Sequence, residues 1–282
     1  MPAVPVCVLT PVWEQFSALL PICPEFVPTH PLGCHRKRVS DRVVFDHVVL
    51  ALVHGSGYER IASPGCSDRT IRRRVRAWAE DGLAEHLHRL ALEQYDHLIG
   101  LDPADVVVDG CITKAPGGGE KAGRSPVDRG KQGLKRSTLT DATGIPLHPV
   151  SAGANRHDAP LLAPTLAGLD LLGPLPPVIT LHPDRGYDSA VVCTLLSDLG
   201  PTGEIARKGI PAPIQVGKRW VVERTQSRMN GYGKLRRCTE RAGVVIDFCL
   251  FLAAALVIAR SLIQRARETF RWDGRPTTRR LK

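Results

Sequence analysis

Apolar residues recur at helical spacing through the first hundred residues of the chain. Between 68 and 80, for example, Ile71, Val75 and Trp78 are three or four positions apart and would share one face of a helix. Capping residues and glycines mark where such segments begin and end. The pattern predicts helices at 12–20, 41–54, 58–62, 68–80 and 83–99.

From residue 101 onward, short apolar runs alternate with helical segments. The runs predict strands at 104–109, 135–140, 145–152, 177–181 and 202–206. Helices are predicted at 158–172 and 188–200, from Trp220 onward, and at 244–267. Three successive strands favour antiparallel pairing, and strands separated by helices favour parallel pairing. The expected fold class is α/β with a mixed (α+β) sheet covered by helices on both sides, the ribonuclease H-like arrangement.

These patterns divide the chain into four parts. Residues 1–38 form a proline-rich arm, 39–100 an all-helical domain, 101–270 the ribonuclease H-like domain and 271–282 a basic tail. The start of the chain lacks the basic region and apolar run of a secretory signal. The most apolar run, 248–259, is shorter than the roughly 20 residues that span a bilayer and predicts a buried helix. Eight scattered cysteines, without the spacing of a zinc or redox motif, are typical of free thiols in the cytoplasm.

Charge points to a polyanionic partner. The formal net charge is +10 and the pI about 9.5, which favours nucleic acid first and an acidic membrane surface second. The helices at 58–62 and 68–80 have the layout of a helix-turn-helix DNA reader. Acids are nearly absent from the second helix before Glu80, so DNA contact is favoured over a solvated, ion-paired face. The arginines suited to phosphates and guanine edges are Arg69, Arg72, Arg73, Arg74 and Arg76.

Three acidic residues fall at positions that this fold would bring together. Asp109 ends the first predicted strand, Asp184 follows the fourth, and Glu223 lies on the helix after the fifth. The first and fourth strands are neighbours in a ribonuclease H-like sheet, so the two aspartates would lie close to each other. Converging carboxylates repel one another unless cations lie between them, and hard oxygen ligands suit Mg²⁺ or Mn²⁺. Taken singly, each acid could be a cap or an ion-pair partner, and Asp184 a turn residue.

Several segments resemble the DDE transposases of bacterial insertion sequences, in the insertion-sequence-five group. The matching segments, which cover most of the chain, are Val-Val-Val-Asp109-Gly, Gly-Arg-Ser-Pro-Val-Asp-Arg-Gly-Lys131-Gln-Gly-Leu-Lys135, Leu-Thr-Asp141-Ala-Thr-Gly-Ile-Pro-Leu, Ala-Asn155-Arg-His157-Asp, Asp184-Arg-Gly-Tyr-Asp-Ser and Arg-Trp-Val-Val-Glu223-Arg-Thr. Several long matches in the right order are more specific than one short motif. By this resemblance, Asp109, Asp184 and Glu223 form the catalytic triad and hold the metal.

The resemblance implies a transposase that binds the terminal repeats of an insertion sequence and catalyses metal-dependent DNA cleavage and strand transfer. Two ions of Mg²⁺ or Mn²⁺, about 4 Å apart, would hold the attacking and leaving oxygens. The expected partners are double-stranded DNA, as element ends and target, and a second copy of the chain. The expected location is the bacterial cytoplasm at the nucleoid, without a membrane role. Further DNA contacts are expected from Arg124, Arg129, Lys131, Lys135, Arg185, Arg219, Arg224 and Lys234.

Three positions near Glu223 depart from the family pattern. Gln226 stands where relatives usually have an aromatic residue, Arg228 where they have tryptophan, and Asn230 where the wider superfamily has lysine. These departures leave open a catalytically decayed copy that acts only as a DNA-binding protein or repressor. A nuclease that cuts DNA without joining it is a further alternative.

Overall fold

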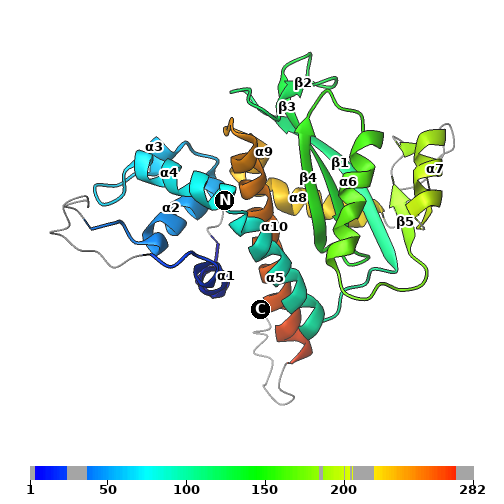
Figure 1. Ribbon diagram of the computed structural model, residues 1–282, viewed down its shortest axis with the longest axis horizontal. Coiled ribbons are helices and arrows are strands. Elements are labelled where there is room, and N and C mark those ends of the chain that lie inside the picture. The colour runs from blue at the N-terminus through cyan, green and yellow to red at the C-terminus, as the bar shows by residue number, and fades with distance from the viewer. Residues whose placement is uncertain are drawn as a thin grey trace, which may run out of the picture.

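The computed structural model describes residues 4–23, 37–183, 187–199, 201–203, 205 and 219–270. Within them, N-terminal helices and a helix-covered sheet form two packed parts. The long helix α10 (Gly243–Thr269) lies between these parts (Figure 1).

The N-terminal part follows the predicted helices closely. Its elements are α1 (Val6–Ala18), α2 (Asp41–His54), α3 (Tyr58–Ile61), α4 (Asp68–Glu80) and α5 (Leu83–Leu98). The last four helices confirm the predictions made from apolar spacing. The first begins at Val6 rather than at residue 12 and includes Pro11. Burial of Val8, Val12 and Phe16 on one face outweighs the backbone hydrogen bond that Pro11 cannot donate.

Phe16 lies at the centre of the helical core. The centroid of its ring is 4.9 Å from that of Phe45 and 5.0 Å from that of Trp78. Phe248 of α10 adds a third ring, 6.5 Å away and edge-on. These contacts join α1, α2, α4 and α10 in one core, because large aromatic rings bury much apolar surface.

The sheet contains six strands. They are β1 (Asp105–Lys114), β2 (Gly123–Arg124), β3 (Gln132–Thr140), β4 (Pro146–Gly153), β5 (Thr180–Pro183) and β6 (Thr202–Gly203). The strand order is β2-β3-β1-β5-β6, and β4 also pairs with β3. β3 pairs antiparallel with β1 and β4, whereas β5 pairs parallel with β1 and β6. This order confirms the mixed, ribonuclease H-like sheet and the pairing of the first predicted strand with the fourth.

β1 is longer than the predicted strand, and Asp109 does not end it. The ladder with β3 continues from the pair Asp109–Thr138 to the pair Lys114–Gly133. An Asp-Gly sequence is a local turn signal, but β3 supplies a partner for every residue of β1 from Val107 to Lys114. Gly110 has a packing role instead, since a Cβ there would come within 2.5 Å of the Asp158 carboxylate.

Helices cover both faces of the sheet, as predicted. Thr165 of α6 (Ala159–Leu166) donates a hydrogen bond to the hydroxyl of Ser137, whereas Gln226 of α8 (Arg219–Asn230) donates one to that of Thr138. Adjacent residues of a strand point to opposite faces, so α6 and α8 lie on opposite sides. The remaining elements are the 3₁₀ helix η1 (Ala167–Leu171), α7 (Ala190–Leu199) and α9 (Gly233–Arg236).

α10 is the central helix of the molecule. It is long and apolar enough to cross a membrane by length and composition, but 78% of its most apolar window is buried inside the protein. This burial confirms the buried helix predicted at 248–259. Most of its apolar side chains pack among the N-terminal helices, while Ile258 joins the core of the sheet together with Leu92 and Tyr95 of α5. Both cores therefore share α5 and α10, and the domain boundary near residue 100 remains a prediction.

Candidate active site

Helix α8 is anchored over the part of the sheet that carries Asp109. Gln226 donates hydrogen bonds from Nε2 to the hydroxyl of Thr138 (3.1 Å) and to the backbone carbonyl oxygen of Asp109 (3.4 Å). Thr138 is directly opposite Asp109 in the β1–β3 ladder, and the side chains of opposite residues share one face of a sheet. The carboxylate of Asp109 therefore lies on the face that α8 covers.

A second contact, one turn later, fixes the direction of α8. Arg136, the ladder partner of Cys111, donates hydrogen bonds to Sγ of Cys111 (3.3 Å) and to Oδ1 of Asn230. Cys111 is two residues after Asp109 and shares its face. Gln226 thus lies over Asp109 and Asn230 over Cys111, so α8 runs along β1 in the direction of the strand. The positive charge beside Asn230 comes from Arg136, which the sequence reasoning missed because no motif marks it.

Glu223 is exposed and lies one turn before Gln226. The direction in which Glu223 points can be deduced from Thr225 on the same helix. The hydroxyl of Thr225 donates a hydrogen bond to the carbonyl oxygen of Gly144 (2.7 Å), in the turn between β3 and β4. Successive residues of a helix are about 100° apart, so Glu223 and Thr225 point to nearly opposite sides. Glu223 therefore points away from the β3–β4 turn and toward the β5 side of β1.

The turn that holds α8 is built on a buried carboxylate. Asp141 accepts hydrogen bonds from the backbone N–H groups of Thr143 (3.0 Å) and Ile145 (2.8 Å). Burial raises the pKa of Asp141, while these hydrogen bonds act in the opposite direction. The carbonyl oxygen of Thr143 in turn accepts a hydrogen bond from Arg224 (2.7 Å). Asp141 thus orients the turn for α8.

The strand β5 lies beside β1 on the side opposite to β3. Val107 is opposite His182 and Val108 is opposite Pro183. His182 therefore shares the α8 face, where its Nε2 lies 2.8 Å from Oδ1 of Asp105. This contact joins β1 and β5 on the face that carries Asp109.

Asp184 and Arg185 lie outside the described residues, so their predicted positions are not seen. Within the described ranges, no group of three acidic, histidine or cysteine side chains is arranged to hold a metal ion. Those ranges contain only two of the three expected acids, Asp109 and Glu223. The arrangement of the complete triad therefore stays a prediction.

Two of the expected DNA-binding lysines are buried in ion pairs. Lys135 pairs with Asp158 (3.0 Å), on the sheet face opposite to α8. Lys234 pairs with Glu240, and its Nζ lies 4.5 Å from the centroid of the Tyr58 ring. Neither ammonium group is presented to a phosphate in this structure. Asp158 is 23 residues from Lys135, and Glu240 is six residues from Lys234 but beyond the end of α9, so helical spacing reveals neither pair.

The other expected basic residues differ in exposure. Arg124, Arg129 and Lys131 are exposed on β2 and the turn that follows it. Arg224 is half-buried, and Arg219 begins α8 but its side chain lies outside the described part.

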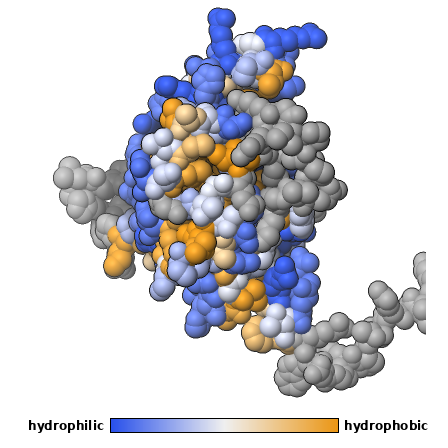
Figure 2. Space-filling view, turned by 90° about the vertical axis from the view of Figure 1, so that its right-hand side faces the viewer, coloured by the Kyte–Doolittle hydropathy of each residue, from blue (hydrophilic) through white to orange (hydrophobic). Residues whose placement is uncertain are grey.

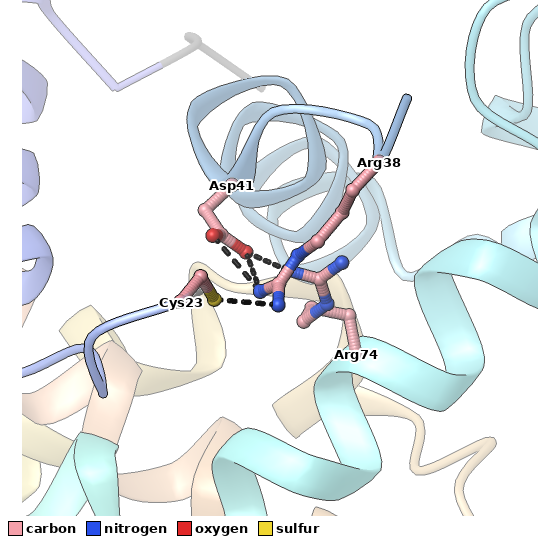
Figure 3. Close-up of polar contacts among 4 residues, drawn as sticks. All are labelled: Cys23, Arg38, Asp41 and Arg74. Carbon is pink, nitrogen blue, oxygen red and sulfur yellow. Dashed lines mark hydrogen bonds and ion pairs between the residues drawn. The ribbon is translucent and has the colours of Figure 1, made fainter. Parts of the chain in front are cut away.

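Most arginines of α4 have acidic partners, contrary to the expectation for this helix. Arg72 lies 2.7 Å from Glu59 and 3.6 Å from Asp68, and Arg76 lies 2.8 Å from Glu80. Arg74 is buried, and Figure 3 shows its guanidinium and that of Arg38 pointing at the carboxylate of Asp41. In the part of the chain that the structure describes, only two arginines of α4 are exposed without an ion-pair partner. These are Arg69 and Arg73.

An apolar pocket lies on the sheet face opposite to the acids. It has a volume of about 340 Å³ and is lined by residues of α6, η1 and the segment before β5, including Leu166, Leu169 and Ile179. Figure 2 shows the side of the molecule that carries α7, where apolar patches lie among polar surface. Val178 and Val191 are both exposed. With Asp170 as its one charged lining residue, this pocket lacks the chemistry of a phosphodiester site.

Comparisons with known proteins add an independent observation. No family model matches the chain. A Burkholderia cepacia protein named "Putative transposase for insertion sequence element IS402" is 34% identical over 157 residues, which are 51% of this chain and 72% of that protein. The uncharacterized 16.2 kDa protein of insertion element IS402, also from Burkholderia cepacia, is 29% identical over 115 residues, 40% of this chain and 78% of that protein.

Among solved structures, the Mos1 Strand Transfer Complex is 10% identical, with 95% of this chain and 88% of that chain covered and a TM-score of 0.33. The Mos1 mariner paired end complex with Mn is also 10% identical, with 93% and 88% covered and a TM-score of 0.27. TM-scores this low carry no argument about the site. The sequence match to the IS402 protein shows that the chain belongs to the family of insertion-sequence transposases.

Proposed function

We propose that this chain is a metal-dependent DDE transposase, which cleaves DNA at the ends of an insertion sequence and joins them to target DNA. The observation that supports this most directly is the anchoring of α8 by Gln226 over Asp109. With α8 held there, Glu223 points toward the β5 side of the face that carries Asp109.

The last described residue of β5 gives further support. Pro183 lies opposite Val108, and the residues that follow them in the sequence are Asp184 and Asp109. Strand alternation would direct Asp184 to the face of His182, which is also the face of Asp109. Three carboxylates from β1, the end of β5 and α8 would then converge on one place.

This donor set fits hard divalent cations. Carboxylate oxygens of Asp109, Asp184 and Glu223 would hold Mg²⁺ or Mn²⁺. Two ions would be needed to bind both the attacking and the leaving oxygen. Bound ions would lower the pKa of the attacking hydroxyl or water and stabilise the leaving oxygen. Arg136 is a diagonal neighbour of Asp109 across the ladder, at a Cα separation of roughly 7–8 Å, and its charge would offset repulsion among the acids.

The remaining parts of the proposal concern partners and place. Exposed Arg69 and Arg73 on α4 would contact the element end, and Arg124, Arg129 and Lys131 would contact phosphates near the acids. A second copy of the chain would hold the other end. The reaction would take place at the nucleoid in the bacterial cytoplasm.

A strand-transfer assay tests the proposal. Purified protein is incubated with DNA that carries the native element ends, a supercoiled target and Mg²⁺ or Mn²⁺. Joined products are expected with the wild type and should be lost with EDTA, with Asp109→Asn and with Glu223→Gln. The two substitutions keep the size of each side chain and remove its charge. Ser227→Ala, at an exposed position of α8, is the control. End binding without cleavage would indicate the decayed repressor, and cutting without joining would indicate a plain nuclease.

A further inference from the structure

Four arginines gather where α8 meets α10. Arg224 and Arg228 are one turn apart on α8, and Arg260 and Arg265 lie in the C-terminal half of α10. The two helices pack against each other. In Figure 1, α10 lies between the sheet and the N-terminal helices, and α8 runs behind the sheet. Arg228, Arg260 and Arg265 are exposed, and Arg224 is half-buried. We call these four residues the α8–α10 arginine cluster.

The positive charge of the cluster is not compensated within the described part of the chain. None of the four guanidinium groups forms an ion pair with an acidic side chain there. Partial burial lowers the pKa of Arg228, and the nearby charges of Arg224, Arg260 and Arg265 lower it further. The arginines of α4 differ, because three of them have acidic partners. Like charges held together without counter-ions indicate a site for an external anion.

The position of Arg224 connects the cluster with the acid face. Its guanidinium donates a hydrogen bond to the carbonyl oxygen of Thr143 (2.7 Å) and lies 4.7 Å from the centroid of the Trp220 ring. Trp220 is 45% exposed, so an aromatic surface adjoins the cations. Because Arg224 and Thr225 both hold the turn between β3 and β4, the cluster lies on the flank of α8 opposite to the one toward which Glu223 points. Arg224 directly follows Glu223, so a duplex whose phosphodiester reaches the acids would extend over α8 to this flank.

We propose that the α8–α10 arginine cluster binds the phosphate backbone of duplex DNA on the flank of α8 opposite to the catalytic acids, as a second DNA surface separate from α4. Its place across α8 from a reaction centre rests on the proposed function. Guanidinium groups suit this task because their planar forks match phosphate oxygens and stay charged when partly desolvated. Arg228, which departs from the tryptophan of relatives, is then a phosphate ligand and not a sign of decay. Phosphates between the four cations relieve their mutual repulsion.

The salt dependence of binding to a short duplex of arbitrary sequence tests this proposal. Fluorescence anisotropy gives the association constant over a range of salt concentrations for the wild type and for Arg228→Gln/Arg260→Gln. Each lost phosphate contact reduces the slope of log K against log salt by about 0.9, so the double variant should lose about 1.8 and each single variant about half of that. Circular dichroism confirms that the variants are folded.

Arg89→Gln is the matched control. Arg89 is exposed on α5, and its guanidinium lies 3.8 Å from the carboxylate of Glu93, so its charge is already compensated. Its slope should equal that of the wild type. An unchanged slope in the double variant overturns the proposal, and so does a wild type that fails to bind duplex. The proposal is also overturned if the double variant loses binding to anionic phospholipid vesicles and keeps the duplex binding of the wild type. That result would assign the cluster to a membrane surface.

The two proposals fail in different ways. Asp109→Asn should abolish strand transfer and leave the salt slope unchanged, because it removes no phosphate contact. If the wild type joins no DNA but Arg228→Gln/Arg260→Gln has a smaller salt slope than the wild type, the second DNA surface is supported and the proposed function is not.

Discussion

Gln226 of α8 donates a hydrogen bond from Nε2 to the backbone carbonyl oxygen of Asp109, 3.4 Å away. The same amide donates to the hydroxyl of Thr138, and the side chain is 5% exposed. Hydrogen bonds shielded from water in this way fix the position of a helix on a sheet. Gln226, where relatives usually have an aromatic residue, therefore ties the helix of Glu223 to the strand of Asp109.

Gln226→Leu should weaken both stability and strand transfer. Leucine keeps much of the volume but leaves the buried hydroxyl of Thr138 without its donor, which costs about 1–2 kcal/mol of the free energy of unfolding. Strand transfer should fall further than stability alone explains, since α8 loses its register on β1. Urea unfolding and the rate of joining measure the two effects, with Ser227→Ala as the control on the same helix. Unchanged joining by the folded variant would show that Gln226 serves stability only.

Arg74 should matter for stability and not for DNA. Its buried guanidinium pairs with Asp41, which Arg38 also contacts. Loss of one partner from a buried pair costs roughly 3–5 kcal/mol. Arg74→Met should cost less, about 2–3 kcal/mol, because Asp41 is partly exposed and keeps Arg38. Chemical denaturation measures this loss. Reduced DNA affinity in the folded variant at low temperature would contradict the structural role.

Arg69 and Arg73 should show the opposite behaviour. Both are exposed on α4 without an ion-pair partner among the residues that the structure describes. Arg69→Gln and Arg73→Gln should each reduce the salt slope of DNA binding by about 0.9 and change stability little. Arg76→Gln is the comparison, because Arg76 is already paired with Glu80. Equal effects for all three variants would show that ion pairing does not decide which arginines reach DNA.

The sequence predicted those features that local spacing and topology determine. Helices such as 41–54 and 68–80 follow from apolar periodicity, because one face must be buried. The strand order follows from three consecutive strands and then alternating helices, which leave few arrangements. The same reasoning placed the first and fourth strands side by side.

Features that depend on distant partners were not predictable in this way. β1 passes Asp109 because β3 pairs with it, a contact that no turn signal reports. Lys135 and Lys234 read as free cations, yet Asp158 and Glu240 neutralise them in the folded chain. Arg136 carried no motif, since its role comes from its place opposite Cys111. In each case the fold, and not the neighbouring sequence, selects the partner.

A buried histidine links the helical part to the sheet and should make stability depend on pH. His88 of α5 is buried, and its Nε2 lies 2.9 Å from the carbonyl oxygen of Pro146 at the start of β4. Burial lowers the pKa of His88 from 6.5 to about 4. Burial also lowers the pKa of the nearby His148. Between about pH 4 and pH 6.5, His88 carries a proton in the unfolded chain but not in the folded chain.

The stabilising effect of neutral His88 is therefore fully present above about pH 6.5 and is lost as the pH falls toward about 4. At about 1.4 kcal/mol per pH unit, His88 alone should lower the free energy of unfolding by about 2 kcal/mol between about pH 7.5 and pH 5. His88→Gln, whose amide can still donate to Pro146, should remove this part of the pH dependence. His86→Gln, at an exposed position of the same helix, should not. Urea unfolding across this range measures both, and equal pH dependence in wild type and His88→Gln would show that His88 is not the group that couples stability to pH.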